Sequence, residues 1–577
     1  MAKEKTGKIS STVNLLLLSW FILTPVFWHL NTSEGIYGSY DVFFMAPYSV
    51  FHLVIFYALG VISVYLSKLS LYHVLLFGLY FPFIQLSNYP YLTIRDAYLH
   101  AGPAKTILVN GQLTTKDPTP ESWPSSFFLH GILTIVSGCD LINANYILYL
   151  SLIIALVLIS YSFARILEKK NYRLAWASPL LFLCLFFNHL FDNFHHYART
   201  PLAFAFLFFF FFSLMGLEDR CSAHTRLTLQ LLICVSVVIT HPFQSLALIA
   251  FMFAYWILSR KIKPINFALF SIVTFIAWIM FQGSSNFLEA INRLKTFFSP
   301  QYLTPIVETL ATKETLPWWG VILRDYYKYS LLALLAIAFF ATIVVLRRKR
   351  ITAIAVGLSS LLFSSVVMLF SLLLLPDWQI GRFTPFAAFP AAFTSLILLE
   401  EALKKGNLKI LSLTRNLFRK RYTSATLLLF VVSLSATVMV LRFERNYYFG
   451  EMCHPSELSS LAFFFTHDHN STVNIVSWRT YSYSPYFDYN SSHQLLRIWY
   501  LELNEYAGNS SKLLFSQSQL INQSQFVIRG LRDSFTSGQL YPSEAILKVV
   551  DEEMIIPRFD LIYSNGYYWI YKRAVSP

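Results

Sequence analysis

Charged residues are scarce in this sequence of 577 residues. They make up 13% of the chain, while hydrophobic residues make up 55%; soluble domains average about 25% charged residues. This scarcity excludes a soluble globular protein. Apolar runs about twenty residues long recur along the chain, as at residues 352–375, and each can cross a hydrocarbon core about 30 Å thick.

Cysteine motifs are also missing. The five cysteines show no Cys-x-x-Cys spacing, so neither a zinc site nor a disulfide framework is indicated, and only a single Cys139–Cys453 bridge stays open. The formal net charge is +14, but most of the excess lies in short loops between apolar runs. It therefore indicates membrane topology, and no nucleic-acid partner is expected.

The apolar runs predict an all-α polytopic membrane protein with about thirteen transmembrane helices. The first run follows the basic residues Met1–Lys8 and is longer than the core of a cleaved signal, so we interpret it as a retained span. The predicted spans are residues 12–30, 45–66, 70–89, 141–163, 174–190, 201–217, 227–240, 243–258, 265–281, 330–346, 351–375, 384–400 and 424–441.

Lysine and arginine concentrate in the loops on one side of these spans. The positive-inside rule places that side, and the N-terminus, in the cytoplasm. An odd number of spans then places the C-terminal tail outside: beyond the cell membrane of a prokaryote or archaeon, or in the endoplasmic reticulum lumen of a eukaryote. The basic clusters are Arg165/Lys169/Lys170/Arg173, Arg260/Lys261/Lys263, residues 347–350 and residues 404–421.

The composition changes after the last span, which divides the chain into a transmembrane domain, residues 1–444, and a polar extracytoplasmic domain, residues 445–577. Strand-like segments in the tail predict a small α/β or mainly β domain. They are residues 473–478, 525–528, 545–550 and 560–571, the last divided by a Ser564-Asn565-Gly566 hairpin signal. Glycosylation sequons all fall on the outer side, at Asn31, Asn470, Asn490, Asn509 and Asn522.

The first large outer loop, residues 90–125, carries candidate chemistry. Asp96 follows a hydrophobic helix directly, with Arg95 before it and His100 four residues later. If this backbone is helical, Asp96 and His100 share one face. A carboxylate close to the membrane is costly unless it is paired, so Asp96 is a candidate catalytic residue. Pairing with Arg95, or capping of a helix, is the structural alternative.

The next outer loop, residues 191–200, contains an Asp-x-x-His-His cluster. Asp192, His195 and His196 offer oxygen and imidazole ligands that suit Mn²⁺, Mg²⁺ or Zn²⁺. Asp96 is a further candidate ligand of the same cation. The alternative is that the histidines are interfacial residues with apolar bodies and hydrated tips.

Three basic residues and two tryptophans mark other outer positions. Arg199 begins a span, where a guanidinium can bind a phosphate through two hydrogen bonds or extend to lipid headgroups. His241 and Arg382 lie in outer turns. Trp318 and Trp319 stand in the outer loop at residues 282–328 and can stack on a sugar or anchor the loop at the membrane interface.

The order of these features resembles the GT-C superfamily of polytopic glycosyltransferases, which includes the oligosaccharyltransferase catalytic subunit and the protein mannosyltransferases. The family has an acidic residue in its first large outer loop, followed by a His…Gly…Trp-Pro return. The matching positions here are Asp96, His100, Gly111 and Trp123-Pro124. A second polar motif sits two spans later in the family, where this chain has the Asp-x-x-His-His cluster. Two extra spans before Asp96 depart from the family pattern.

The resemblance implies a glycosyltransferase that moves a sugar from a polyprenyl-phosphate-linked donor to a saccharide or protein acceptor at the outer face of the lipid membrane. It implies that Asp96 acts as the general base or, together with the Asp-x-x-His-His cluster, holds a Mn or Mg ion that balances the phosphate charge. Donor-phosphate contacts are then Arg199 and Arg382, and substrate contacts are Arg95, His100, His241, Trp318 and Trp319. No Trp-Trp-Asp motif stands in the tail, which argues against protein N-glycosylation as the reaction.

Two other functions remain open. A transporter or flippase of lipid-linked saccharides would place polar groups near the bilayer midplane and often has internal repeats, whereas here the polar residues cluster at the outer ends of spans. A non-enzymatic cell-surface assembly protein would use the tail as its working part and the spans as an anchor, which thirteen spans make costly.

Overall fold

The computed structural model of the chain describes helices in its first half and strands near its C-terminus. The described residues are 2–27, 47–67, 70–88, 95–112, 123–169, 178–183, 197, 199–216, 222–259, 262–282, 336, 388–397, 472–475, 494–497, 526–530, 559–564 and 568–573.

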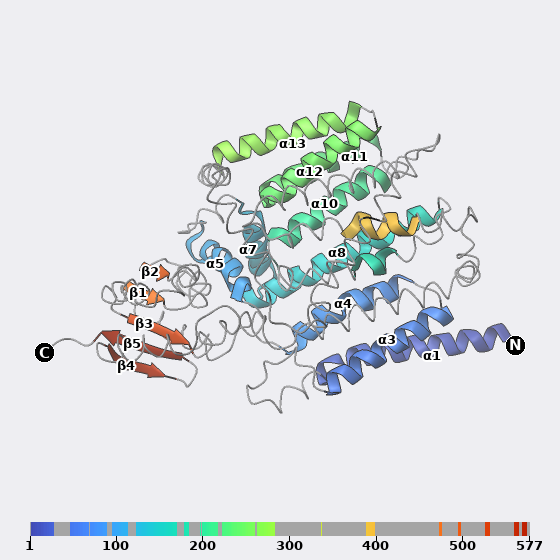
Figure 1. The fold of residues 1–577 in the computed structure, drawn as a ribbon, viewed down its shortest axis with the longest axis horizontal. Coiled ribbons are helices and arrows are strands. Elements are labelled where there is room, and N and C mark those ends of the chain that lie inside the picture. The colour runs from blue at the N-terminus through green and yellow to red at the C-terminus, as the bar shows by residue number, and fades with distance from the viewer. Residues whose placement is uncertain are drawn as a thin grey trace.

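The long helices lie beside one another as a bundle, and two shorter ones, α5 and α7, lie at the end of the bundle away from the N-terminus (Figure 1). The bounds are α1 Ala2–Ile22, α3 Pro47–Ser67, α4 Leu71–Asn88, α5 Arg95–Asn110, α7 Ser125–Ser137, α8 Leu141–Lys169, α10 Arg199–Gly216, α11 Ala223–Thr240, α12 Pro242–Ser259 and α13 Ile262–Phe281.

The described helices are apolar on their outward-facing surfaces. Among the described helices, Leu141–Glu168 and Ala223–Thr240 are long and apolar enough to cross a membrane, and shorter apolar helices accompany them. Large apolar side chains point away from the bundle: Leu232 of α11 is 61% exposed and Val273 of α13 is 66% exposed. Water penalises such a surface and hydrocarbon does not. We therefore treat the helical part as a membrane bundle.

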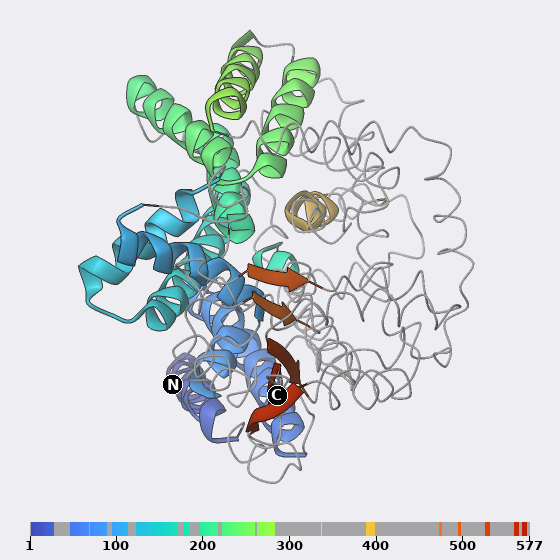
Figure 2. The same ribbon diagram turned by 90° about the vertical axis from the view of Figure 1, so that its left-hand side faces the viewer.

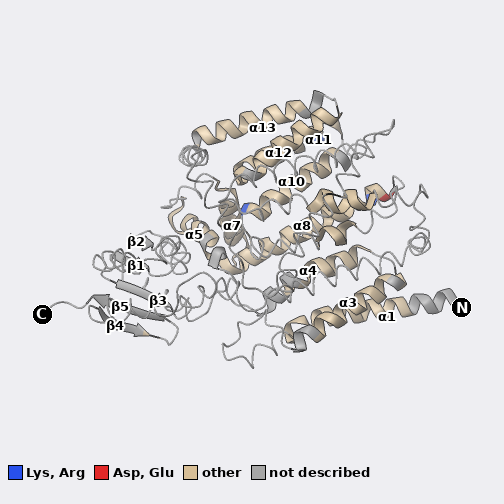
Figure 3. Ribbon diagram, viewed as in Figure 1, with Lys and Arg blue, Asp and Glu red and all other residues tan. Residues whose placement is uncertain are grey.

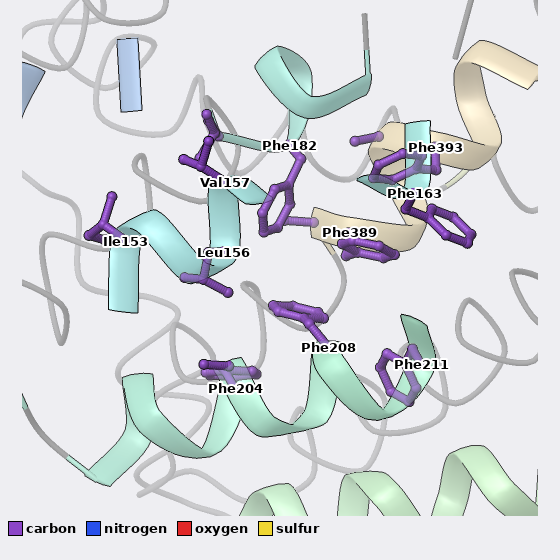
Figure 4. Close-up of a cluster of buried hydrophobic side chains, with 14 of the residues drawn as sticks. Ile153, Leu156, Val157, Phe163, Phe182, Phe204, Phe208, Phe211, Phe389 and Phe393 are labelled. Atoms are coloured by element: carbon purple, nitrogen blue, oxygen red, sulfur yellow. The ribbon is translucent and has the colours of Figure 1, made fainter. Parts of the chain in front are cut away.

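Phenylalanine rings fill the centre of the bundle and hold distant segments together (Figure 4). The Phe208 ring of α10 lies 5.0 Å from Phe389 and 5.5 Å from Phe182, between ring centroids. Phe163 of α8 lies 5.6 Å from Phe389. Aromatic pairs at such distances contribute about 0.5–1.5 kcal/mol beyond the area they bury. They pack the helical segment 388–397 against α8 and α10.

Hydrogen bonds join the first helices where the bundle is otherwise apolar. His52 of α3 has Nδ1 2.9 Å from the Tyr80 hydroxyl of α4 and Nε2 2.9 Å from the Trp20 carbonyl oxygen of α1. The carbonyl can only accept, so Nε2 carries the proton and Nδ1 accepts from Tyr80. Lipid provides no hydrophobic force between helices, and such bonds help to select their partners.

Five strands form one mixed sheet in the C-terminal region, in the order β2-β1-β3-β5-β4. β1 pairs in parallel with β2 and β3, while β5 pairs antiparallel with β3 and β4. The sheet lies at the end of the bundle that carries α5 and α7, which faces the viewer in Figure 2. The bounds are β1 Thr472–Ile475, β2 Gln494–Arg497, β3 Phe526–Gly530, β4 Phe559–Ser564 and β5 Tyr568–Arg573.

Wherever a predicted span is described, it falls on a helix, although α1 begins at Ala2, ten residues before its predicted span, and α8 continues to Lys169. The spans predicted at 330–346, 351–375 and 424–441 lie outside the described residues, apart from a single residue at 336, so the number thirteen stays a prediction. Three features were not predicted as elements. These are helix α5, which falls in the predicted outer loop, helix α7, which is apolar but too short for a span, and strand β2, which is only four residues long.

The tail agrees with its predicted strands in three places. β1, β3 and the β4–β5 hairpin fall on the predicted segments. The segment 545–550, the boundary at residue 444, the connections that would decide between α/β and mainly β, and all five sequons are not among the described residues. Cys139 is a free cysteine, and Cys453 is not described.

Candidate functional site

Helix α5 supplies the first part of the site, because its backbone is helical from Arg95 onward. Asp96 and His100 therefore lie one turn apart on the same face, as the conditional prediction required. The side chains of Arg95 and Asp96 are not described. The His100 ring is half-buried and packs nearly parallel to the Phe127 ring, with 6.2 Å between centroids and 21° between planes.

Helix α7 begins directly after Trp123-Pro124, the return predicted from the sequence. Two side chains of its first turn are buried, Ser126 at 1% and Phe127 at 2% exposed. The Ser125 hydroxyl donates a hydrogen bond to the Thr240 hydroxyl at 2.7 Å, and Thr240 donates onward to the Ser236 carbonyl oxygen at 2.5 Å. The start of α7 is therefore fastened to the end of α11.

Arg199 lies at the first residue of α10 and reaches the same place. Its Cζ atom lies 5.6 Å from the centroid of the Phe127 ring, within the range of a cation–π interaction. The side chain is half-buried. Phe127 thus contacts His100 from α5 and Arg199 from α10, two residues that the sequence analysis singled out separately.

The chain entering α10 is held by buried polar contacts. The Asn145 side chain of α8 bonds both the main-chain N–H and the carbonyl oxygen of Tyr197. The His130 ring of α7 meets the Tyr197 ring edge to face, 5.8 Å between centroids, and its Nε2 donates to the Leu141 carbonyl oxygen at 2.8 Å. Burial lowers the pKa of His130 to about 4 and raises the pKa of Tyr197. Both side chains are therefore neutral at physiological pH.

The turn between α11 and α12 lies next to the start of α7, through the Ser125–Thr240 hydrogen bond. His241 is buried and in extended conformation, and Pro242, whose fixed backbone angle suits the first turn of a helix, is the first residue of α12. Gln244, 2% exposed, lies in the first turn of α12, and its side-chain oxygen has no hydrogen-bond partner.

Three helices thus begin at one place, α7 at Ser125, α10 at Arg199 and α12 at Pro242. The Phe127–Arg199 contact joins the starts of α7 and α10, and the Ser125–Thr240 bond joins α7 to the turn before α12. Helix N-termini carry about half a positive charge and unsatisfied N–H groups. Together with the Arg199 guanidinium they make this place favourable for an anion.

Charges are otherwise rare on the described helices (Figure 3). Asp140, at the start of α8, is exposed and accepts hydrogen bonds from two α8 main-chain N–H groups, so its carboxylate is used in capping. Burial lowers the pKa of Lys105 on α5. The Arg165–Glu168 ion pair lies in the last turns of α8, at the opposite end from Asp140.

Several predicted site residues fall on parts of the chain that the structure does not describe. The part that it describes contains no group of three or more His, Cys, Asp or Glu side chains arranged to hold a metal ion. The predicted cation site at Asp96 and the Asp-x-x-His-His cluster is not described, so it stays a prediction. The undescribed predicted residues are Asp192, His195, His196, Trp318, Trp319 and Arg382.

Sequence reasoning missed Phe127, Asn145 and Gln244. Asn145 carried a signal, because an amide within a long apolar run needs a buried hydrogen-bond partner. Gln244 carried the same signal in the first turn of a span. Phe127 carried none, since the sequence holds 54 phenylalanines and nothing local separates one that contacts an arginine from the rest.

No family model matches the chain, and no curated protein matches it. Solved structures do. The chain is similar to ArnT from Cupriavidus metallidurans in the apo state, with a TM-score of 0.49, 12% identity, and coverage of 84% of this chain and 95% of ArnT. The same ArnT bound to undecaprenyl phosphate gives a TM-score of 0.48 and 10% identity, over 91% of this chain and 98% of that one.

A third similar structure is the Archaeoglobus fulgidus oligosaccharyltransferase in complex with Zn and sulfate. Its TM-score is 0.47 at 11% identity, over 87% of this chain and 73% of that one. ArnT and this oligosaccharyltransferase are GT-C glycosyltransferases, the superfamily that the sequence resembles. At these TM-scores the likeness assigns no role to any residue of this chain.

Proposed function

We propose that the protein transfers a sugar from a polyprenyl-phosphate-linked donor to a saccharide or protein acceptor, and that the site around Arg199 binds the donor phosphate. The observation that carries the proposal is the placement of Arg199 where α7, α10 and α12 begin. A guanidinium and helix N-termini are the groups that bind phosphate in proteins.

The proposed reaction exchanges one bond at the anomeric carbon. The acceptor hydroxyl oxygen bonds to that carbon, the bond from the carbon to the phosphate oxygen breaks, and the lipid phosphate leaves with the electron pair. Asp96 takes the hydroxyl proton. The transition state resembles an oxocarbenium ion, and Arg199 stabilises the charge that develops on the departing phosphate. A phosphate leaving group needs no acid partner to protonate it.

The surroundings of the site suit a lipid substrate. α7 turns Phe127 and His130 inward, while Ile132, Ile135 and Val136 are 55%, 69% and 79% exposed on its other side. One short helix therefore separates the Arg199 region from an apolar surface. In this proposal the charged headgroup lies on the Arg199 side of α7 and the polyprenyl tail on the apolar side.

Topology and metal use belong to the same proposal. The N-terminus and the basic loops are cytoplasmic, and the site and the sheet are extracytoplasmic. Bound to Asp96, Asp192, His195 and His196, a Mn or Mg ion would balance phosphate charge. Dialysis against EDTA followed by return of Mn²⁺ or Mg²⁺ tests this part, and activity unaffected by EDTA contradicts it.

Binding of decaprenyl phosphate to the full chain in lipid nanodiscs tests the proposed site. We expect Arg199→Gln to weaken binding about tenfold or more, since hydrogen bonds to charged groups contribute about 1.5–3 kcal/mol. The matched control is Arg226→Gln, because Arg226 is a half-buried arginine in the first turn of α11. Equal losses in both variants would contradict the assignment.

Transfer itself is tested with a panel of decaprenyl-phosphate sugars and simple saccharide acceptors. We expect product with the wild-type chain and none with Asp96→Asn that melts at the wild-type temperature. Movement of these lipids across a vesicle membrane without any product would support the flippase alternative instead.

A further inference from the structure

Phe127 connects two helices of the candidate site without belonging to either. It lies in the first turn of α7, yet its ring contacts His100 of α5 and the Arg199 guanidinium of α10. Only 2% of Phe127 is exposed, whereas its neighbour Phe128 is 42% exposed. Both residues are phenylalanines of α7, but only the Phe127 ring faces the site.

The face of the Phe127 ring lies against the Arg199 guanidinium. A ring face attracts a cation through its quadrupole, with a strength of about 0.5–2 kcal/mol. This contact leaves the positive charge of the guanidinium in place.

The main chain on both sides of the Phe127–Arg199 contact is held by hydrogen bonds. The Ser125–Thr240 hydrogen bond fastens the start of α7, and the two bonds from Asn145 to Tyr197 fasten the chain just before Arg199. Ring and guanidinium are therefore both positioned by buried contacts before any ligand arrives. A preorganised cation loses little freedom when an anion binds.

We infer that Phe127 is a positioning residue for donor binding. Its ring orients the Arg199 guanidinium toward the phosphate of the lipid-linked donor and keeps the His100 ring beside it. Phe127 acts through Arg199 and does not touch the reacting atoms. This role rests on the proposed function, because the phosphate is the ligand that Arg199 is held ready to bind.

Fluorinated phenylalanines test the role with little change of shape. One, two or three ring fluorines, introduced at position 127 by nonsense suppression, weaken the attraction of the ring face for a cation stepwise. We expect the dissociation constant for decaprenyl phosphate in nanodiscs to rise with each fluorine, by about 3- to 30-fold over the series. The same series at position 128 is the control and should leave binding unchanged. Melting temperatures should stay constant in both.

Ordinary substitutions give a second measurement. Phe127→Leu should weaken decaprenyl phosphate binding as much as the most fluorinated ring, while Phe127→Tyr, which keeps the ring face, should restore it to within about threefold. A flat fluorine series at position 127, with intact binding by the wild-type chain, overturns the positioning role and leaves the proposed function standing.

Failure of the proposed function gives a different result. If the wild-type chain does not bind decaprenyl phosphate, both the phosphate site and the role of Phe127 in donor binding are overturned. The Phe127–Arg199 contact is then still decided by the melting temperatures of Phe127→Leu, Arg199→Gln and the double variant. Non-additive shifts support the contact, and additive shifts contradict it.

Discussion

Asn145 of α8 holds the main chain of Tyr197, 52 residues further along, through two hydrogen bonds. The Tyr197 N–H donates to the Asn145 side-chain oxygen at 3.2 Å, and the Asn145 amide donates to the Tyr197 carbonyl oxygen at 3.4 Å. Asn145 is completely buried. Because Tyr197 precedes Arg199 by two residues, these two bonds hold the main chain just before the start of α10.

Replacing Asn145 should therefore damage both stability and donor binding. Asn145→Ala leaves a buried N–H and a buried carbonyl without their partner, which costs about 1–3 kcal/mol for each buried group left unsatisfied. Thermal unfolding of the purified chain measures the effect. Asn143→Ala is the matched control, since Asn143 lies on the same helix and is exposed. Its melting temperature should stay close to that of the wild type, and equal shifts in the two variants would refute the role.

His130 should make the protein less stable in acid. Burial lowers its pKa from 6.5 to about 4, and the hydrogen bond to the Leu141 carbonyl oxygen opposes this in part. Between these two pH values the unfolded chain binds more protons than the folded one, so the free energy of unfolding falls as the pH falls from about 6.5 to about 4. The loss from this group approaches about 3 kcal/mol.

The comparison for His130 is His130→Gln, which can donate to Leu141 but does not titrate. We expect unfolding at pH 7.5 and pH 4.5 to show a larger loss of stability in the wild type than in this variant. Parallel losses would mean that other groups control the acid response.

Gly78 should not tolerate a side chain. A Cβ atom at this position of α4 would lie 2.7 Å from Cγ2 of Val157 on α8, and overpacking of this kind costs about 1–3 kcal/mol. Gly131→Ala is the control, because there the nearest neighbouring atom would be 3.7 Å away and alanine favours the helix by about 0.5–1 kcal/mol. Gly78→Ala should melt lower than the wild type and Gly131→Ala should not. The reverse order would contradict this packing.

The exposed side of α7 should face lipid. A nitroxide attached through an unnatural amino acid at Ile135, 69% exposed, should be relaxed more strongly by oxygen, which concentrates in hydrocarbon, than by a water-soluble nickel chelate. The same label at Asn110, exposed at the end of α5, should show the opposite preference. Nickel accessibility at both positions would place α7 in water.

Much of the helical architecture could be predicted from local pattern. Apolar runs predict spans because a segment in hydrocarbon must make its own backbone hydrogen bonds, which a helix does without partners elsewhere in the chain. Pro242 could be placed at the start of α12 because proline suits the first turn of a helix. Helix α7 escaped prediction because its thirteen residues are too few to span and too apolar to look like a loop. Strand β2 was not predicted because four residues are too few to show an alternation of apolar and polar side chains.

The site divides in the same way. Sequence by itself predicted that polar residues such as Asp96, His100, Arg199 and His241 gather at the ends of spans, since hydrocarbon excludes them elsewhere. Tertiary structure alone decided which of them meet. Phe127 lies between His100 and Arg199, and Asn145 forms hydrogen bonds with the main chain of Tyr197. Both contacts arise because helices far apart in sequence pack side by side. Contacts of this kind depend on how helices pack against one another, which no local pattern of residues records.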